Sequence, residues 1–140
     1  MLSPLLSASR GKVMGTIFEL NRRGTFNIET ARKLLPLVYK ITAETDQEFQ
    51  GLMEQVTKTR EAANLVKTVE LELEIHNLIS RWESKLTKLG LDPKGVWLVD
   101  FDTGDGLFCW KYPEMDIRFW HGYNDGFSGR KPIQENTLPN

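Results

Sequence analysis

The apolar residues of this chain change their spacing once, close to residue 90, and this change limits the folds open to it. From Leu34 to Val56 they recur at steps of three and four residues, and a second stripe with the same steps runs from Leu71 to Leu89. Between residues 96 and 121 apolar and polar residues tend to alternate instead. Steps of three and four place side chains on one face of an α-helix, whereas alternation places them on one face of a β-strand. The sequence therefore predicts an α+β fold, in which a long antiparallel helical hairpin packs on a small three-stranded antiparallel meander.

The two helices carry start and stop signals at their ends. Asn27 is a good N-cap, and Glu29 in the first turn suits the positive end of the helix dipole. Gly90 follows the second stripe directly, at the position where a glycine often ends a helix. Asn64 is the best turn residue in the connecting stretch, because residues 58–68 contain neither glycine nor proline. We therefore expect the hairpin to occupy residues 27–90.

Strands are expected at residues 96–101, 107–112 and 115–121, with turns at 102–105 and 113–114. If Phe101 faces Gly106 and Tyr112 faces Met115, the side chains sort into two faces. The face toward the helices then holds Trp97, Val99, Phe101, Phe108, Trp110, Ile117, Phe119 and His121, and the other face holds Leu98, Asp100, Leu107, Cys109, Lys111, Asp116, Arg118 and Trp120. This register predicts that Trp97, Trp110 and Phe119 point inward together.

The remaining segments differ from these elements in composition. Residues 1–24 are expected to form a flexible leader with a short strand at 16–20, and Met14 is an alternative start. Residues 25–133 are expected to form a single domain, made of the hairpin, the meander at 96–121 and a glycine-rich loop at 122–133. Residues 134–140 are polar and are expected to fray.

Charge and cysteine content argue against several classes of protein. The net charge of the 140 residues is −1, so the chain has no overall positive field for nucleic acid or an anionic membrane. Its single cysteine, Cys109, rules out an internal disulfide and any zinc motif built on cysteine pairs. No apolar run approaches the roughly 20 residues that span a bilayer. These features predict a soluble, cytoplasmic protein that binds neither nucleic acid nor a membrane, and nothing in the sequence requires a cofactor.

The last third of the chain contains a series of short motifs, Asp100-Phe101, Cys109-Trp110, Glu114, Trp120-His121, Gly126-Phe127 and Gly129-Arg130. Together with the segment FNIETARKLLPLV, they resemble the bacterial domain of unknown function 2203 family from about residue 26 to residue 133. The chain departs from that family at residues 95–99, where GVWLV replaces a shorter Gly-Leu-Val and leaves the start of the first strand open. The resemblance implies a shared fold and carries no activity. It marks as important Asp100, Cys109, Trp110, Glu114, Trp120, His121 and Arg130.

His121 is the candidate for a general base or a metal ligand, because imidazole exchanges a proton near neutral pH and binds metals well. The acids available to it are Asp100, Asp102, Asp105 and Asp125. The expected register puts His121 and Asp100 at the same end of the sheet but on opposite faces, and it puts Glu114 at the other end. Asp100 and His121 are therefore the candidate ligands of any metal. The alternative is a histidine that bonds to one aspartate and holds the loop in place.

Arg130 and Trp120 each allow two interpretations. An arginine on a glycine-rich loop can bind a carboxylate or a phosphate of a ligand with two hydrogen bonds. The alternative for Arg130 is an internal clamp to Asp100 or Asp125. Trp120 faces outward in the expected register, where it would anchor an interface or stack on a ligand.

Four further residues have structural interpretations. Trp97 and Trp110 are expected in the core beneath the helices, and Glu114 in a turn. Cys109 is expected to be a small buried filler, because the register separates it from His121 and leaves it without a base.

These interpretations favour a non-enzymatic, oligomeric binding or scaffolding module. Matching helical stripes and surplus apolar groups predict a homodimer formed through the helices. Asp100, Trp120, His121 and Arg130 would form a rim that contacts a protein partner or a small anion. The alternative is a metal-dependent or acid–base enzyme that uses Asp100, His121 and Arg130.

Overall fold

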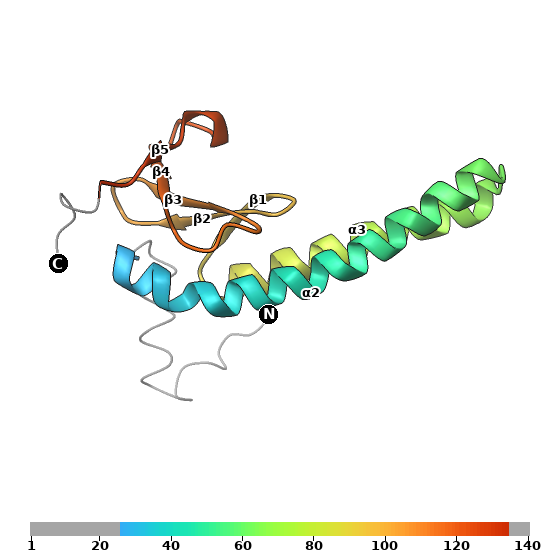
Figure 1. The fold of residues 1–140 in the computed structure, drawn as a ribbon, viewed down its shortest axis with the longest axis horizontal. Coiled ribbons are helices and arrows are strands. Elements are labelled where there is room, and N and C mark those ends of the chain that lie inside the picture. The colour runs from blue at the N-terminus through green and yellow to red at the C-terminus, as the bar shows by residue number, and fades with distance from the viewer. Residues whose placement is uncertain (1–25, 135–140) are drawn as a thin grey trace, which may run out of the picture.

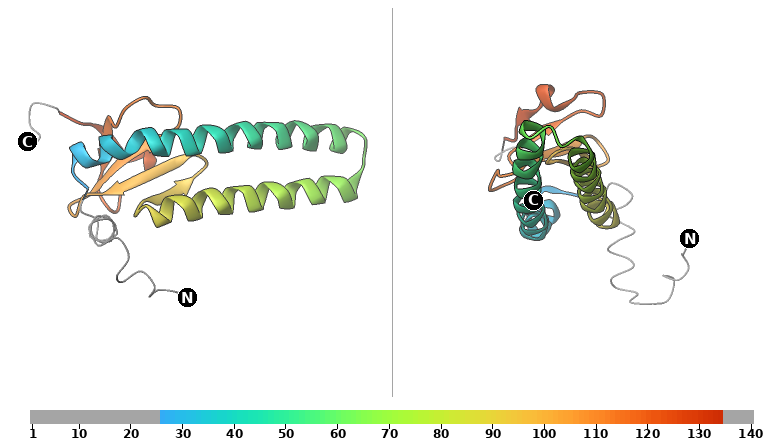
Figure 2. Two further views of the ribbon diagram at one scale, coloured as in Figure 1. Left: turned by 90° about the horizontal axis from the view of Figure 1, so that it is seen from below. Right: turned by 90° about the vertical axis from the view of Figure 1, so that its right-hand side faces the viewer.

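The computed structural model describes residues 26–134. Two helices, α2 (Ile28–Glu61) and α3 (Leu65–Lys88), form an antiparallel hairpin, and five strands follow them. The strands are β1 (Asp92–Gly95), β2 (Leu98–Asp102), β3 (Leu107–Lys111), β4 (Phe119–His121) and β5 (Lys131–Pro132), which form one antiparallel sheet in sequence order. The sheet lies on one end of the hairpin, and the turn between the helices projects well beyond it (Figures 1 and 2). The predicted α+β class is confirmed.

The sheet has five strands where three were expected. β1 comes from residues before the first predicted strand, and β5 comes from the end of the glycine-rich segment. Both strands are too short for an alternating pattern to predict them from the sequence, because β1 has four residues and β5 has two. The predicted leader at 1–24, its strand at 16–20 and the tail beyond residue 134 lie outside the described residues.

Asparagine side chains cap the N-termini of both helices, Asn27 as predicted and Asn64 where only a turn was predicted. The Asn27 side chain accepts a hydrogen bond from the Thr30 N–H at 2.8 Å, and the Thr30 hydroxyl accepts one from the Asn27 N–H at 3.0 Å, which completes a capping box. Asn64 caps α3 by accepting from the Lys67 N–H at 3.1 Å. Among residues 26–134, no helix is both long and apolar enough to cross a membrane.

The hydrophobic core is concentrated where the sheet meets the hairpin. There Trp82 of α3 packs edge-on against Trp97, with ring centroids 4.9 Å apart, and donates its indole N–H to the Thr42 hydroxyl at 2.9 Å. The buried members of this cluster include Leu35, Val38, Leu86, Val99, Phe101, Trp110 and Ile117. Farther along the hairpin a second cluster has only four buried members, Leu52, Val56, Leu71 and Leu78. The far part of the hairpin is therefore held mainly by contacts between the two helices.

The pairing of β2 with β3 keeps the predicted faces. Phe101 pairs with Phe108 and Asp100 pairs with Cys109. This register is two residues away from the predicted pairing of Phe101 with Gly106. A shift by two leaves every side chain on its expected face, because the faces alternate with a period of two.

The predicted pairing of the third strand is wrong by one residue, and this changes which side chains meet. Cys109 pairs with Phe119 and Leu107 pairs with His121, so Phe119 and His121 lie on the face of Cys109 and not on the face of the helices. Trp120 pairs with Phe108 and moves to the opposite face from the one predicted. The expectation that Trp97, Trp110 and Phe119 point inward together is therefore wrong.

The shift follows from contacts between this segment and α2. The Arg32 guanidinium of α2 donates to the Asp116 carboxylate at 3.0 Å and to the Ile117 carbonyl at 2.9 Å. These bonds draw the segment toward the helix and bury Ile117 in the core. Since the backbone here does not follow strand pairing, β4 begins only at Phe119, and its alternation starts again from there.

Candidate functional site

Three polar side chains from three adjacent strands meet on the sheet face turned away from the helices. Asp100 of β2, Cys109 of β3 and His121 of β4 are all buried, with 2%, 0% and 4% of their surfaces exposed. One ligand atom from each, a carboxylate oxygen, Sγ and an imidazole nitrogen, lies within 4.8 Å of the other two. The predicted separation of His121 from Asp100 and Cys109 on opposite faces is wrong, because the one-residue shift in β4 brings all three together.

The backbone fixes how the His121 ring is used. Its Nδ1 lies 2.8 Å from the Gly122 carbonyl oxygen, and its Nε2 lies 3.2 Å from Asp100 Oδ1. A carbonyl only accepts hydrogen bonds, so Nδ1 must donate. Nε2 therefore faces the Asp100 carboxylate, and the space between them needs a proton or a metal ion to join the two atoms. Gly106 permits this packing, because a Cβ there would lie 3.0 Å from the His121 carbonyl oxygen.

Burial changes the proton affinities of the other two members of this cluster. The pKa of Asp100 lies above its ordinary value because burial penalises the carboxylate, although His121 and the Cys109 thiol oppose the change. Burial also raises the pKa of Cys109 to about 12, and the Asp100 charge acts in the same direction. The free thiol is therefore protonated at neutral pH, which agrees with a structural role and argues against a nucleophile.

Arg130 is bound inside the domain, but its partner is not the one expected. Its guanidinium donates to both carboxylate oxygens of Glu114, at 3.1 and 2.7 Å, whereas Asp100 and Asp125 were the predicted partners. The rings of Phe119 and Phe127 lie 4.0 and 4.2 Å from its Cζ atom. The prediction that placed Glu114 at the far end of the sheet missed this pair, because the long Arg130 side chain runs along the short β4.

Glu114 is also tied to the strand before it. Its carboxylate accepts from the Lys111 N–H at 2.8 Å, and its carbonyl oxygen accepts from the Trp110 indole N–H at 2.7 Å. Glu114 thus connects its turn to Trp110 in the core and to Arg130. The structural roles predicted for Trp97, Trp110 and Glu114 agree with these positions, since both tryptophans are buried in the main core.

A pocket of about 370 Å³ lies beside the buried cluster. Asp100 and His121 line it together with Lys94, Leu107 and the loop at 123–127. Two hydrogen bonds fasten the first part of this loop: Asp125 accepts from the Gly122 N–H at 3.1 Å, and the Tyr123 hydroxyl donates to Asp102 at 2.7 Å. The cluster is therefore next to a space that a small ligand could occupy.

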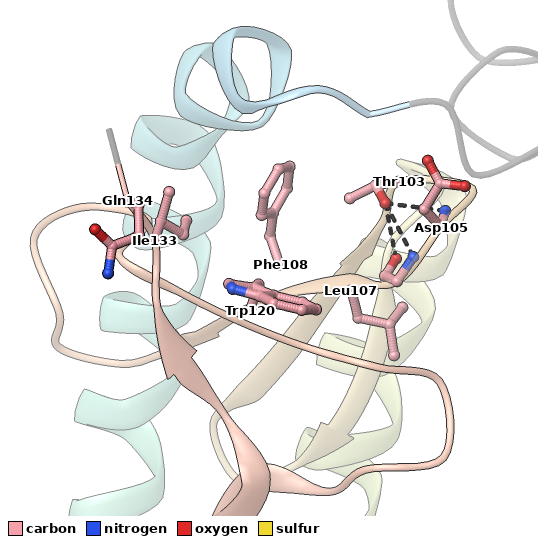
Figure 3. A pocket seen from close by; sticks show the side chains of 8 residues that line it. Thr103, Asp105, Leu107, Phe108, Trp120, Ile133 and Gln134 are labelled. Atoms are coloured by element: carbon pink, nitrogen blue, oxygen red, sulfur yellow. Dashed lines mark hydrogen bonds between the residues drawn. The ribbon is translucent and has the colours of Figure 1, made fainter. Parts of the chain in front are cut away.

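A second pocket, of about 340 Å³, lies beside Trp120 (Figure 3). Phe108, Leu107 and Ile133 line it with the Trp120 ring, and Thr103, Asp105 and Gln134 add polar groups. Trp120 is 40% exposed, although the other three tryptophans are buried. Across the β4–β5 pair, the Lys131 ammonium lies 5.9 Å from the Trp120 ring centroid.

The predicted rim does not exist as one surface. Trp120 is open to solvent, His121 is buried against Asp100, and Arg130 is paired with Glu114. The sequence did not predict that Cys109 meets His121, nor did it predict the Trp120 pocket. A signal for the first was present, since alternation placed Cys109 and Asp100 on one face, but the register of β4 hid it.

These features define a small α+β domain with a projecting helical hairpin and a buried Asp–Cys–His cluster. Residues 24–133, more than half of the chain, match the family DUF2203, described as an uncharacterized conserved protein. The chain therefore belongs to the DUF2203 family, which confirms the resemblance found in the motifs. No curated protein and no solved structure matches the chain.

Proposed function

We propose that this domain is a non-enzymatic binding module whose ligand occupies the pocket beside Trp120. The observation that carries the proposal is a partly exposed indole on the wall of an apolar pocket of about 340 Å³. This volume is within the roughly 300–1,000 Å³ common for small-molecule sites, which are mostly apolar with a few polar groups. An exposed tryptophan offers a flat face on which a ring can stack.

The lining favours a planar ligand that is neutral or positively charged. Among residues 26–134 that line the pocket, Asp105 alone carries a charge, and it is negative. Thr103 and Gln134 add groups that can form hydrogen bonds. Arg130, the cation that supported an anionic ligand, is bound to Glu114 instead. We therefore replace the small anion expected from the sequence with a planar ring that has a cationic or hydrogen-bond-donating edge.

Benzamidine and benzoate test this proposal, because they are planar probes of similar size and opposite charge. In spectra of the ¹⁵N-labelled protein, benzamidine should shift the Trp120 indole signal and the backbone amides of Leu107 and Ile133. Benzoate should shift them less, and Asp105→Asn should remove the difference. Trp120→Ala should abolish the response to both. Equal or stronger binding of benzoate would contradict the charge argument, and no shift with either probe would contradict the pocket.

We propose further that the hairpin joins two copies of the chain. Leu65, Val66, Val69 and Leu73 are exposed apolar residues near the start of α3, where they are spaced to form a stripe. Sedimentation of the wild type should show a dimer, and Val69→Lys combined with Leu73→Lys should give a monomer. Glu74→Lys, an exposed change to the same residue type on a different side of the same helix, should leave the dimer intact. A wild type that is monomeric at high concentration would refute this assembly.

The second candidate is a metal-dependent or acid–base enzyme that works at Asp100 and His121. The contact between these two side chains beside the 370 Å³ pocket favours it. Arg130 has no part in this version, because Glu114 holds its guanidinium. A cytoplasmic location remains part of both proposals, since a reducing compartment keeps the single thiol free.

A further inference from the structure

We propose that Asp100, Cys109 and His121 bind one divalent transition-metal ion of the zinc type. This metal site lies on the opposite face of the sheet from the Trp120 pocket and does not depend on a ligand in that pocket. It rests on four features of the cluster: the chemistry of the three ligand atoms, their spacing, the anchoring of the imidazole and the balance of charge.

The three side chains offer one oxygen, one sulfur and one nitrogen. A thiolate and an imidazole together select zinc and its neighbours in the transition series over magnesium or calcium, which prefer oxygen ligands throughout. Each ligand comes from a different strand, and each strand is hydrogen-bonded to the next. The sheet therefore holds the three ligands on a rigid base.

The spacing requires only a small closure. Metal–ligand bonds of about 2.0–2.3 Å set the ligand atoms of a tetrahedral site roughly 3.3–3.8 Å apart. Nε2 of His121 and Oδ1 of Asp100 are 3.2 Å apart, and all three ligand atoms lie within 4.8 Å of one another. The longest separation would need to shrink by about 1 Å, which side-chain rotation can supply.

The His121 ring is held as a ligand histidine usually is. A metal-binding imidazole almost always donates its other N–H to a carboxylate or a backbone carbonyl, which fixes its tautomer and orientation. The Nδ1–H of His121 donates to the Gly122 carbonyl at 2.8 Å and leaves Nε2 directed at the cluster. A metal ion at Nε2 would join this nitrogen to the Asp100 carboxylate.

The charges balance when the ion is present. A carboxylate, a thiolate and a neutral imidazole carry two negative charges, which one divalent ion neutralises. The two nearest cations, Arg130 and Lys94, each have a carboxylate partner outside the cluster, although Arg130 also interacts with the Cys109 thiol and Lys94 acts on Asp100 through its charge. Arg130 is paired with Glu114 at 2.7 Å, and Lys94 is paired with Asp92 at 3.0 Å. Binding would displace the thiol proton, as metals do at coordinating cysteines.

Three protein ligands leave one position of a tetrahedral ion open. Asp100 and His121 line the adjacent pocket, so the open position would be directed toward it. Closed structural zinc sites use four protein ligands, whereas sites that bind water or a substrate use three. The ion would therefore carry an exchangeable water or a donor atom of a small molecule.

Cobalt substitution tests the proposal directly. Because Cys109 is the only cysteine of the chain, a sulfur-to-cobalt charge-transfer band can arise only at this residue. The full chain, stripped of metal with a chelator and without a histidine tag, should bind one Co²⁺ with that band and tetrahedral visible bands. Zn²⁺ should displace the cobalt and raise the melting temperature. Cys109→Ser should abolish the band and weaken zinc binding by at least about 100-fold.

His76→Ala is the matched control, because His76 is the other histidine of the chain and is exposed on α3. It should leave the stoichiometry and the cobalt band unchanged. Cobalt binding without a charge-transfer band would overturn the assignment of Cys109. Failure of the folded wild type to bind either ion would overturn the site, and this result does not depend on whether a variant folds. The benzamidine response at Trp120 would remain untouched by either failure.

Discussion

The two faces of the sheet are built from opposite kinds of side chain. The face toward the hairpin buries rings and aliphatic groups, among them Trp97, Phe101 and Trp110, against α2 and α3. The other face buries Asp100, Cys109 and His121 and is covered by the loop that follows β4. One face is stabilised by the removal of apolar surface from water, whereas the other depends on polar groups that satisfy one another.

This contrast separates the face that contributes most to stability from the face where we propose a metal ion. A small domain gains most of its stability from apolar burial, and polar groups rarely add to it unless all of them have partners. Among the described residues, no buried side-chain nitrogen or oxygen lacks a hydrogen-bond partner. The polar groups of this face are therefore satisfied, and their burial is expected to add less to stability than the apolar face does.

The largest effect is expected on the apolar face. Trp110→Ala should lower the free energy of unfolding by about 3–5 kcal/mol, because it removes a fully buried ring and leaves a cavity. It also frees the Glu114 carbonyl oxygen from its bond to the indole N–H. Urea denaturation followed by circular dichroism would measure the loss. A loss below about 1 kcal/mol would contradict the view that the apolar face provides most of the stability.

An intermediate effect on stability is expected at the ion pair between Arg130 and Glu114. Arg130→Met should cost about 2 kcal/mol, because it leaves the half-buried Glu114 carboxylate without its bidentate partner. The double variant Arg130→Met, Glu114→Gln should recover part of that loss, since no charge is then left unpaired. The same denaturation series would show this as a coupling between the sites. Strictly additive losses would mean that the pair contributes nothing specific.

The smallest effect on stability is expected at Trp120, the partly exposed tryptophan of β4. Trp120→Ala should cost about 1 kcal/mol or less, because the ring is 40% exposed. Its effect on benzamidine binding should nevertheless be complete. Comparing the melting temperature with the spectral response would separate the two properties. A loss as large as that of Trp110→Ala would show that Trp120 belongs to the core, which would weaken the case for a ligand there.

The helices could be predicted well because their signals are local. The apolar steps in residues 34–89, the Asn27 cap and the Asn64 turn all act within a few residues of where they are read. The faces of β2 and β3 followed from alternation, which survives a shift of two residues. The family motifs include Asp100, Cys109 and His121, although they do not show which of these side chains meet.

The site could not be predicted because it depends on contacts between distant parts of the chain. The bonds from Arg32 to Asp116 and Ile117 join residues about 85 positions apart, and they decide where β4 begins. The pairing of Arg130 with Glu114 depends in turn on the course of the glycine-rich segment, which has no periodic pattern. A register error of one residue in β4 was enough to place His121 and Asp100 on opposite faces in the prediction.

The projecting part of the hairpin could be shortened without disturbing the main core. Its four buried members lie away from the sheet, and the main core is complete without them. Removing seven residues from each helix would shorten the arm by about 10 Å and would nearly restore the facing of the remaining side chains, because seven residues are close to two turns. A hairpin of different length would thus hold the same sheet at a different distance from the tip.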